Sequence, residues 1–74
     1  MTSRKIDFYQ EVQIKNNAKT FEYRGQKGAV LGISEENGVL YGYAVHIHGM
    51  DHLVFFDKDE VFPTGIKLSR EDYY

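Results

Sequence analysis

The chain has 74 residues, a formal net charge of −2 and no cysteine. This length predicts a single domain, 1–74, and the absence of cysteine excludes disulfide bonds and thiolate metal sites. The negative charge disfavours nucleic-acid binding, because phosphate contacts require a basic face.

An alternating pattern between Ile6 and Ile14 predicts the first strand. Its apolar side chains share the face that we expect to point inward: Ile6, Phe8, Val12 and Ile14. The polar segment 15–20 ends this strand. Phe21 and Tyr23 are then expected to pack on the sheet as the chain returns.

A glycine-flanked turn precedes the second strand. Gly25 and Gly28 enclose two polar residues, and they predict a tight turn that leads into a strand at residues 29–34. Gly32 leaves room on one face of that strand for a neighbouring backbone or an aromatic ring.

A hairpin and a further turn predict the next two strands. Residues 37–38 are Asn-Gly, which is typical of a type I′ turn. The strand that follows, at 39–48, is expected to point four side chains inward: Tyr41, Tyr43, Val45 and Ile47. A turn at 49–51 and the β-forming residues 52–56 complete a meander of three antiparallel strands.

The last third of the chain holds short elements. Asp57 is expected to cap one turn of 3₁₀ helix at 57–60, and Pro63 belongs at an edge or at the start of a strand. Residues 64–68 form the last short strand, and Ser69 begins a pattern typical of a helix start.

Five short strands with tight turns predict an all-β domain. We interpret it as a small SH3-like, partly open barrel of about five antiparallel strands, with a short helical turn near the C-terminus. The sequence has no apolar stretch typical of a signal peptide or a membrane span, so we expect a cytoplasmic protein without a membrane partner.

Three histidines form the first candidate site. His46 and His48 lie on one strand face, about 7 Å apart by the rise of a strand, and His52 follows a turn. Together with the nearby Asp51 they have the chemistry of zinc ligands. We favour a solvated histidine face, because no residues that would orient metal ligands are recognisable. The expectation is therefore no metal and no cofactor.

Acidic residues form the second candidate site. Residues 38–74 carry three basic and six acidic side chains, which favours a partner with a basic surface. Catalysis by paired carboxylates requires a cleft, which the pattern does not indicate, so we predict no catalytic residue and no enzyme. The predicted contact residues for a protein partner are five acids and an aromatic anchor: Asp57, Asp59, Glu60, Glu71, Asp72 and Tyr74.

A basic segment supports an alternative. Its cations are Lys15, Lys19, Arg24 and Lys27. Phe21 or Tyr23 in the same segment has the ring needed to stack a base, as in a small nucleic-acid- or ribosome-associated module. The negative total charge favours a solvated loop instead. A homodimer through an open strand edge is a third interpretation, and the oligomeric state stays open.

Five segments carry a resemblance to a known family: Phe8–Val12, Gly25–Gly32, Tyr43–Ile47, Phe62–Gly65 and Arg70–Tyr74. In order and spacing they resemble the immunity protein 31 family, small all-β proteins of bacterial polymorphic toxin systems. The resemblance covers the chain from Phe8 onward. It implies that the protein binds and neutralises a toxin domain, and it implies neither the identity of the toxin nor any binding residue.

Overall fold

The computed structural model describes residues 6–68 of the chain, and these form five antiparallel strands in one sheet. The strands are β1 (Gln10–Ile14), β2 (Lys27–Glu36), β3 (Val39–Ile47), β4 (Leu53–Asp57) and β5 (Val61–Lys67). Two 3₁₀ turns accompany them, η1 (Phe21–Tyr23) and η2 (Lys58–Glu60). The predicted all-β fold is confirmed.

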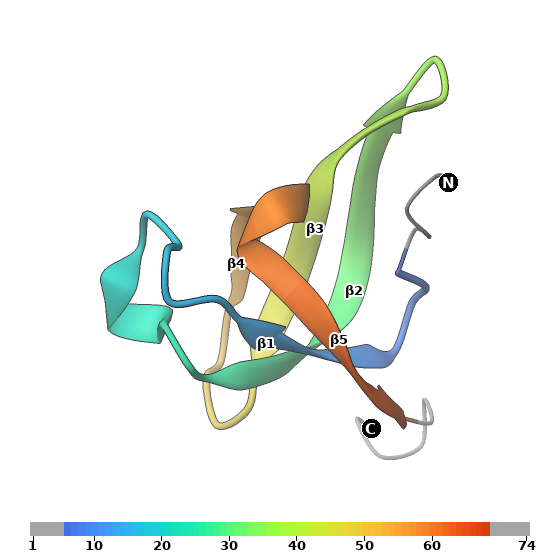
Figure 1. The fold of residues 1–74 in the computed structure, drawn as a ribbon. Coiled ribbons are helices and arrows are strands. Elements are labelled where there is room, and N and C mark those ends of the chain that lie inside the picture. The colour runs from blue at the N-terminus through green and yellow to red at the C-terminus, as the bar shows by residue number, and fades with distance from the viewer. Residues whose placement is uncertain (1–5, 69–74) are drawn as a thin grey trace.

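The sheet curls into a partly open, SH3-like barrel (Figure 1). Its strand order is β4-β3-β2-β1-β5, so β2 is the central strand, β3 and β1 flank it, and β5 pairs with β1. Within the described part of the chain β4 and β5 do not pair with each other, and the sheet is not closed. Pro63 lies in β5, an edge strand, as its missing N–H predicts.

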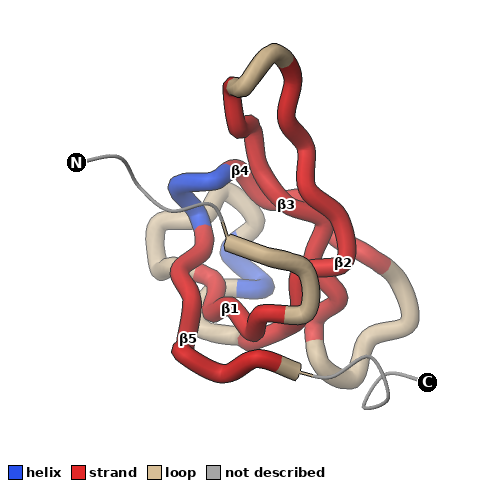
Figure 2. The backbone as a smooth tube through the Cα atoms, turned by 90° about the vertical axis from the view of Figure 1, so that its right-hand side faces the viewer, coloured by secondary structure: helices blue, strands red, loops and turns tan. Residues whose placement is uncertain are grey.

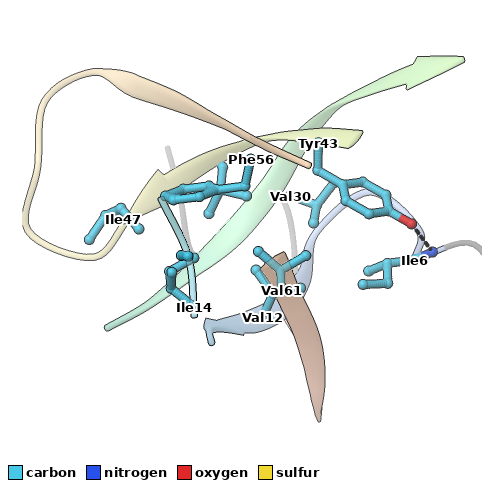
Figure 3. Packing of buried hydrophobic residues seen from close by; sticks show 10 residues of the cluster. Ile6, Val12, Ile14, Val30, Tyr43, Ile47, Phe56 and Val61 are labelled. Carbon is cyan, nitrogen blue, oxygen red and sulfur yellow. Dashed lines mark hydrogen bonds between the residues drawn. The ribbon is translucent and has the colours of Figure 1, made fainter. Parts of the chain in front are cut away.

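The core lies inside this curl (Figure 3). Its largest fully buried side chains come from β1 to β4: Tyr43, Phe56, Ile14, Ile47, Val12, Val30 and Val45. The hydroxyl of Tyr43 accepts a hydrogen bond from the backbone N–H of Ile6 over 2.9 Å, which fixes the segment before β1. The ring of Tyr23 meets Phe56 edge to face, with centroids 6.1 Å apart. This contact confirms that Tyr23 packs on the barrel.

Three local predictions are confirmed by the backbone. Asn37 and Gly38 have φ values of +53° and +78°, as a type I′ turn requires. Gly25 has a φ of +80° and makes the turn before β2. In η2, the side chain of Glu60 accepts a hydrogen bond from the backbone N–H of Asp57 over 2.8 Å, which caps the predicted turn.

Two inward positions were predicted wrongly. Phe8 is half exposed, because Tyr9 adopts a φ of +65° in a turn and the strand begins only at Gln10. Tyr41 is half exposed, because the register of β2 and β3 shifts between the pairs at Ser34 and Glu35 and leaves Tyr41 as an extra residue. Each irregularity breaks the alternation on which the prediction depended.

Two more expectations need correction. Gly28 does not belong to the turn but to β2, where it is buried. Phe21 does not pack on the sheet, because its side chain remains 73% exposed in η1. The helix start predicted at Ser69 lies outside the described residues. No helix within residues 6–68 is long and apolar enough to cross a membrane.

Candidate functional site

The edge strand β4 presents apolar side chains to solvent. Phe56 is fully buried and Val54 packs against the core, whereas Leu53 and Phe55, on the opposite face, are 50% and 52% exposed. Asp57 continues this outward row and is also exposed. Among the strands of the described chain, β4 pairs only with β3, so its other edge remains open.

The ring of Phe55 lies over a glycine on the neighbouring strand. Gly42 pairs with Asp57, and a Cβ atom at position 42 would lie 2.7 Å from Cζ of Phe55. The ring therefore covers the backbone of Gly42, which only a residue without a side chain permits. The other side of the ring is exposed to solvent and available to a partner.

Two of the predicted acidic residues extend this surface. Asp57 lies 3.7 Å from Nζ of Lys19, and Asp59, in η2, lies 3.0 Å from Nζ of Lys58. Both ion pairs are exposed to solvent, where such pairs contribute little to stability. Leu53, Phe55, Asp57 and Asp59 together form what we call the β4 strip.

Glu60, which was also predicted to contact a partner, makes several hydrogen bonds within the fold. Its Oε2 accepts a hydrogen bond from the backbone N–H of Lys19 over 2.7 Å, and its backbone oxygen accepts one from the N–H of Lys15 over 2.8 Å. The hydrogen bond from Lys19 holds the pKa of this carboxyl below its ordinary value. The other three predicted contact residues, Glu71, Asp72 and Tyr74, lie outside the described residues.

The sequence segment that contains β4 has an uneven charge pattern. The strand-by-strand prediction missed it. The stretch 28–57, which includes most of β2 and all of β3 and β4, contains no lysine and no arginine. It contains four acids: Glu35, Glu36, Asp51 and Asp57. Counting charges along the chain would have revealed this segment with four acids and no lysine or arginine, although Lys19 and Lys58 from outside it pair with Asp57 and Asp59. Such a surface attracts a basic partner.

The three histidines do not converge. Nε2 of His46 lies 2.6 Å from the backbone oxygen of Met50, and Nδ1 of His52 lies 3.2 Å from the carboxylate of Asp51. His48 contacts Glu11 instead. Within residues 6–68 there is no group of three or more His, Cys, Asp or Glu residues placed to hold a metal ion.

Glu11 is a further polar residue that sequence reasoning did not select. It is only 8% exposed although it lies on the outer side of β1. Its Oε1 accepts a hydrogen bond from the hydroxyl of Thr64 over 2.7 Å, and its Oε2 accepts one from Nε2 of His48 over 2.9 Å. These bonds lower the pKa of the Glu11 carboxyl, the bond from Thr64 most strongly.

This arrangement differs from that of a catalytic triad. In a triad the histidine stands between the acid and the hydroxyl, so that it can remove the hydroxyl proton. Here the carboxylate of Glu11 stands between Thr64 and His48. The cluster therefore joins two strands, β1 and β5, to the segment that follows β3, and we assign it a structural role.

The β4 strip is thus a surface with the features of a binding site: exposed apolar groups, two acids and an open edge. Comparison of the chain with family models, curated proteins and solved structures gives no match.

Proposed function

We propose that this domain is a non-catalytic protein-binding module that uses the β4 strip to hold a basic partner. The observation that carries the proposal is the half exposure of Leu53 and Phe55 on an open edge strand, directly beside Asp57. Exposed aromatic residues supply much of the affinity of protein interfaces, and an edge strand offers backbone donors and acceptors to an incoming strand.

The partner that we propose is a bacterial toxin domain, which the protein neutralises by stoichiometric binding. This part of the proposal comes from the resemblance of five segments to the immunity protein 31 family. The acidic surface of residues 28–57 supports it, because complementary charge accelerates the encounter with a basic toxin and discourages other acidic partners. No reaction by this chain is needed for such a function.

The test measures binding to a panel of purified toxin domains from bacterial polymorphic toxin systems, by isothermal titration calorimetry. We expect one domain to bind, and we expect Phe55→Ala and Asp59→Lys each to weaken its binding at least about tenfold. Glu60 is left unchanged because its hydrogen bonds brace the fold. The matched control is Phe8→Ala, which removes a half-exposed ring that lies before β1 and outside the β4 strip.

Urea denaturation of each variant is the control for folding. We expect midpoints close to that of the wild type, so that a loss of affinity reports on binding. Binding of no domain by the wild-type protein would refute the proposal. Unchanged affinity of both β4-strip variants would refute the assignment of the surface.

One observation favours a second candidate, a nucleic-acid-binding role of the segment around η1. Phe21 is 73% exposed, and the guanidinium carbon of Arg24 lies 5.4 Å from the centroid of its ring. An aromatic ring beside an arginine is a platform on which a nucleotide base stacks. A mobility shift of single-stranded RNA at low salt that Phe21→Ala abolishes would support this role, and the absence of any shift would exclude it.

A further inference from the structure

The hairpin between β2 and β3 extends beyond the barrel as an arm. We define the hairpin arm as residues 34–41, and Figures 1 and 2 show it projecting away from the other strands. Among the described residues its two strands pair with each other there, Glu35 with Leu40 and Glu36 with Val39. Leu40 is partly buried and packs against the core.

The hairpin arm exposes large apolar side chains to solvent. Val39 and Tyr41 are 52% and 51% exposed. A two-stranded ribbon without a covering layer is only marginally stable in water, so the exposure of these side chains adds nothing to the fold. Large apolar groups on a projecting element are typical of surfaces that become buried on binding a partner.

Register shifts direct the hairpin arm outward. The pairing of β2 with β3 shifts between Val30 and Gly32 and again between Ser34 and Glu35. Each shift increases the local twist and bends the strands. The second shift places Tyr41 as the extra residue, next to Gly42, on which the ring of Phe55 rests. Tyr41 of the hairpin arm therefore precedes, in sequence, the residue over which Phe55 of the β4 strip lies.

The charge of the hairpin arm selects the kind of partner. Glu35 and Glu36 precede the turn at its tip, and neither lysine nor arginine occurs anywhere in residues 28–57. A convex, acidic and partly apolar projection complements a concave surface lined by lysine and arginine. Clefts of that kind belong to enzymes that bind nucleic acid, because phosphate contacts require clustered cations.

We propose that the hairpin arm enters the positively charged nucleic-acid-binding cleft of the partner and so excludes its substrate. This inference rests on the proposed function and goes further: the partner is a nuclease toxin, and neutralisation is competitive with nucleic acid. Glu35 and Glu36 occupy positions that phosphates occupy in the substrate complex, while Val39 and Tyr41 cover the wall of the cleft.

The experiment uses purified nuclease toxin domains and a fluorescein-labelled oligonucleotide with phosphorothioate linkages, which resist cleavage. The oligonucleotide is first bound to the toxin domain, and the protein is then added while fluorescence anisotropy is recorded. We expect the wild-type protein to displace the oligonucleotide. The double variant Glu35→Lys with Glu36→Lys should bind the toxin domain at least about tenfold more weakly, because the two new lysines would face the cations of the cleft.

The matched control is the double variant Asp7→Lys with Glu22→Lys, which changes the net charge by the same amount at two exposed positions outside the hairpin arm. The concentration of this variant that displaces the oligonucleotide should be within about threefold of that of the wild type. A change in total charge alone has no larger effect. A third variant, Val39→Ser with Tyr41→Ser, tests the apolar contact and should also weaken displacement. Urea denaturation of all three variants tests whether they are folded.

The outcomes separate this inference from the proposed function. If the wild-type protein binds a toxin domain without displacing the oligonucleotide, the inference is wrong and the proposed function stands. Equal displacement by the Glu35→Lys and Glu36→Lys double variant would also overturn it. If no nuclease toxin domain binds but a toxin of another class does, the inference alone fails, and if no toxin domain of any class binds, both fail.

Discussion

The hydroxyl of Thr64 donates a hydrogen bond to Oε1 of Glu11 over 2.7 Å, and this bond ties the edge strand β5 to β1 across 53 residues of sequence. The other carboxylate oxygen of Glu11 accepts a hydrogen bond from His48 of the segment that follows β3. One nearly buried carboxylate thus holds together the first strand, the last strand and the end of the central hairpin. The free energy of unfolding of a domain of this size is small. The loss of such a contact therefore has a measurable effect on it.

Replacing Glu11 is expected to destabilise the fold. Glu11→Ala removes the acceptor for both Thr64 and His48, and we expect the free energy of unfolding to fall by about 1–3 kcal/mol. Thr64→Val removes one of the two bonds and should cost about 1 kcal/mol. Urea denaturation at pH 7 measures both. A change of less than about 0.5 kcal/mol for Glu11→Ala, the range of ordinary surface substitutions, would contradict the assigned structural role.

Acid is expected to destabilise the protein through two glutamates. The pKa values of Glu11 and Glu60 are held below the ordinary 4.5, chiefly by the hydrogen bonds from the Thr64 hydroxyl and from the backbone N–H of Lys19. The unfolded chain therefore binds protons at a higher pH than the folded chain does. The stabilisation is complete above the unfolded pKa near 4.5 and is lost as the pH falls through the lower folded values.

Urea midpoints between pH 7 and pH 2.5, a range that extends about 2 units to each side of the ordinary carboxyl pKa, measure this dependence. Glu11→Gln and Glu60→Gln should each flatten the decline in stability at acid pH. Glu22→Gln, at an exposed position of η1, is the control and should leave the decline unchanged. A decline of equal steepness in all three variants would show that other groups cause it.

Two glycines of the central strands are expected to tolerate no side chain. A Cβ atom at Gly28 would overlap the carbonyl oxygen of His46, and one at Gly42 would overlap the carbonyl oxygen of Phe56. Both clashes are with backbone, which cannot move without opening the sheet. Gly28→Ala and Gly42→Ala should therefore each cost about 3 kcal/mol or more, at the upper end for overpacked sites.

Gly32 provides the matched control for these two glycines. A Cβ atom there would meet only the side chain of Ala44, at 3.0 Å, and a small shift of that methyl group relieves the contact. Gly32→Ala should cost about 1 kcal/mol, measured in the same urea titrations. Equal losses at Gly32 and Gly42 would mean that the approach of a neighbouring backbone is not what selects glycine in this sheet.

The predictions that succeeded depend on neighbours in the chain. The Asn37-Gly38 turn adopts positive φ values because these residues allow them at low cost. The turn at 57–60 forms because Glu60 reaches back to the N–H of Asp57, three residues earlier. Tyr43, Val45 and Ile47 alternate inward as their period of two predicts.

The predictions that failed were overridden by irregularities that alternation does not encode. Tyr9 has a positive φ without being glycine or asparagine, and this turn exposes Phe8. The register shift beside Tyr41 depends on how β2 and β3 align over their whole length. Neither feature has a reliable signature in a few consecutive residues.

By itself, the sequence determined that this chain forms five short strands and where most of its turns lie, because turn chemistry and the period of two act over a few residues. Only the tertiary structure decided which strands become edges, and hence that Phe55 is exposed beside Asp57 while Glu60 braces a loop. It also decided that Glu11 is buried between Thr64 and His48, 53 and 37 residues away. The physical reason is that a side chain acquires its partners and its exposure from strands that pair across the curl of the sheet, and such pairing depends on the whole chain at once.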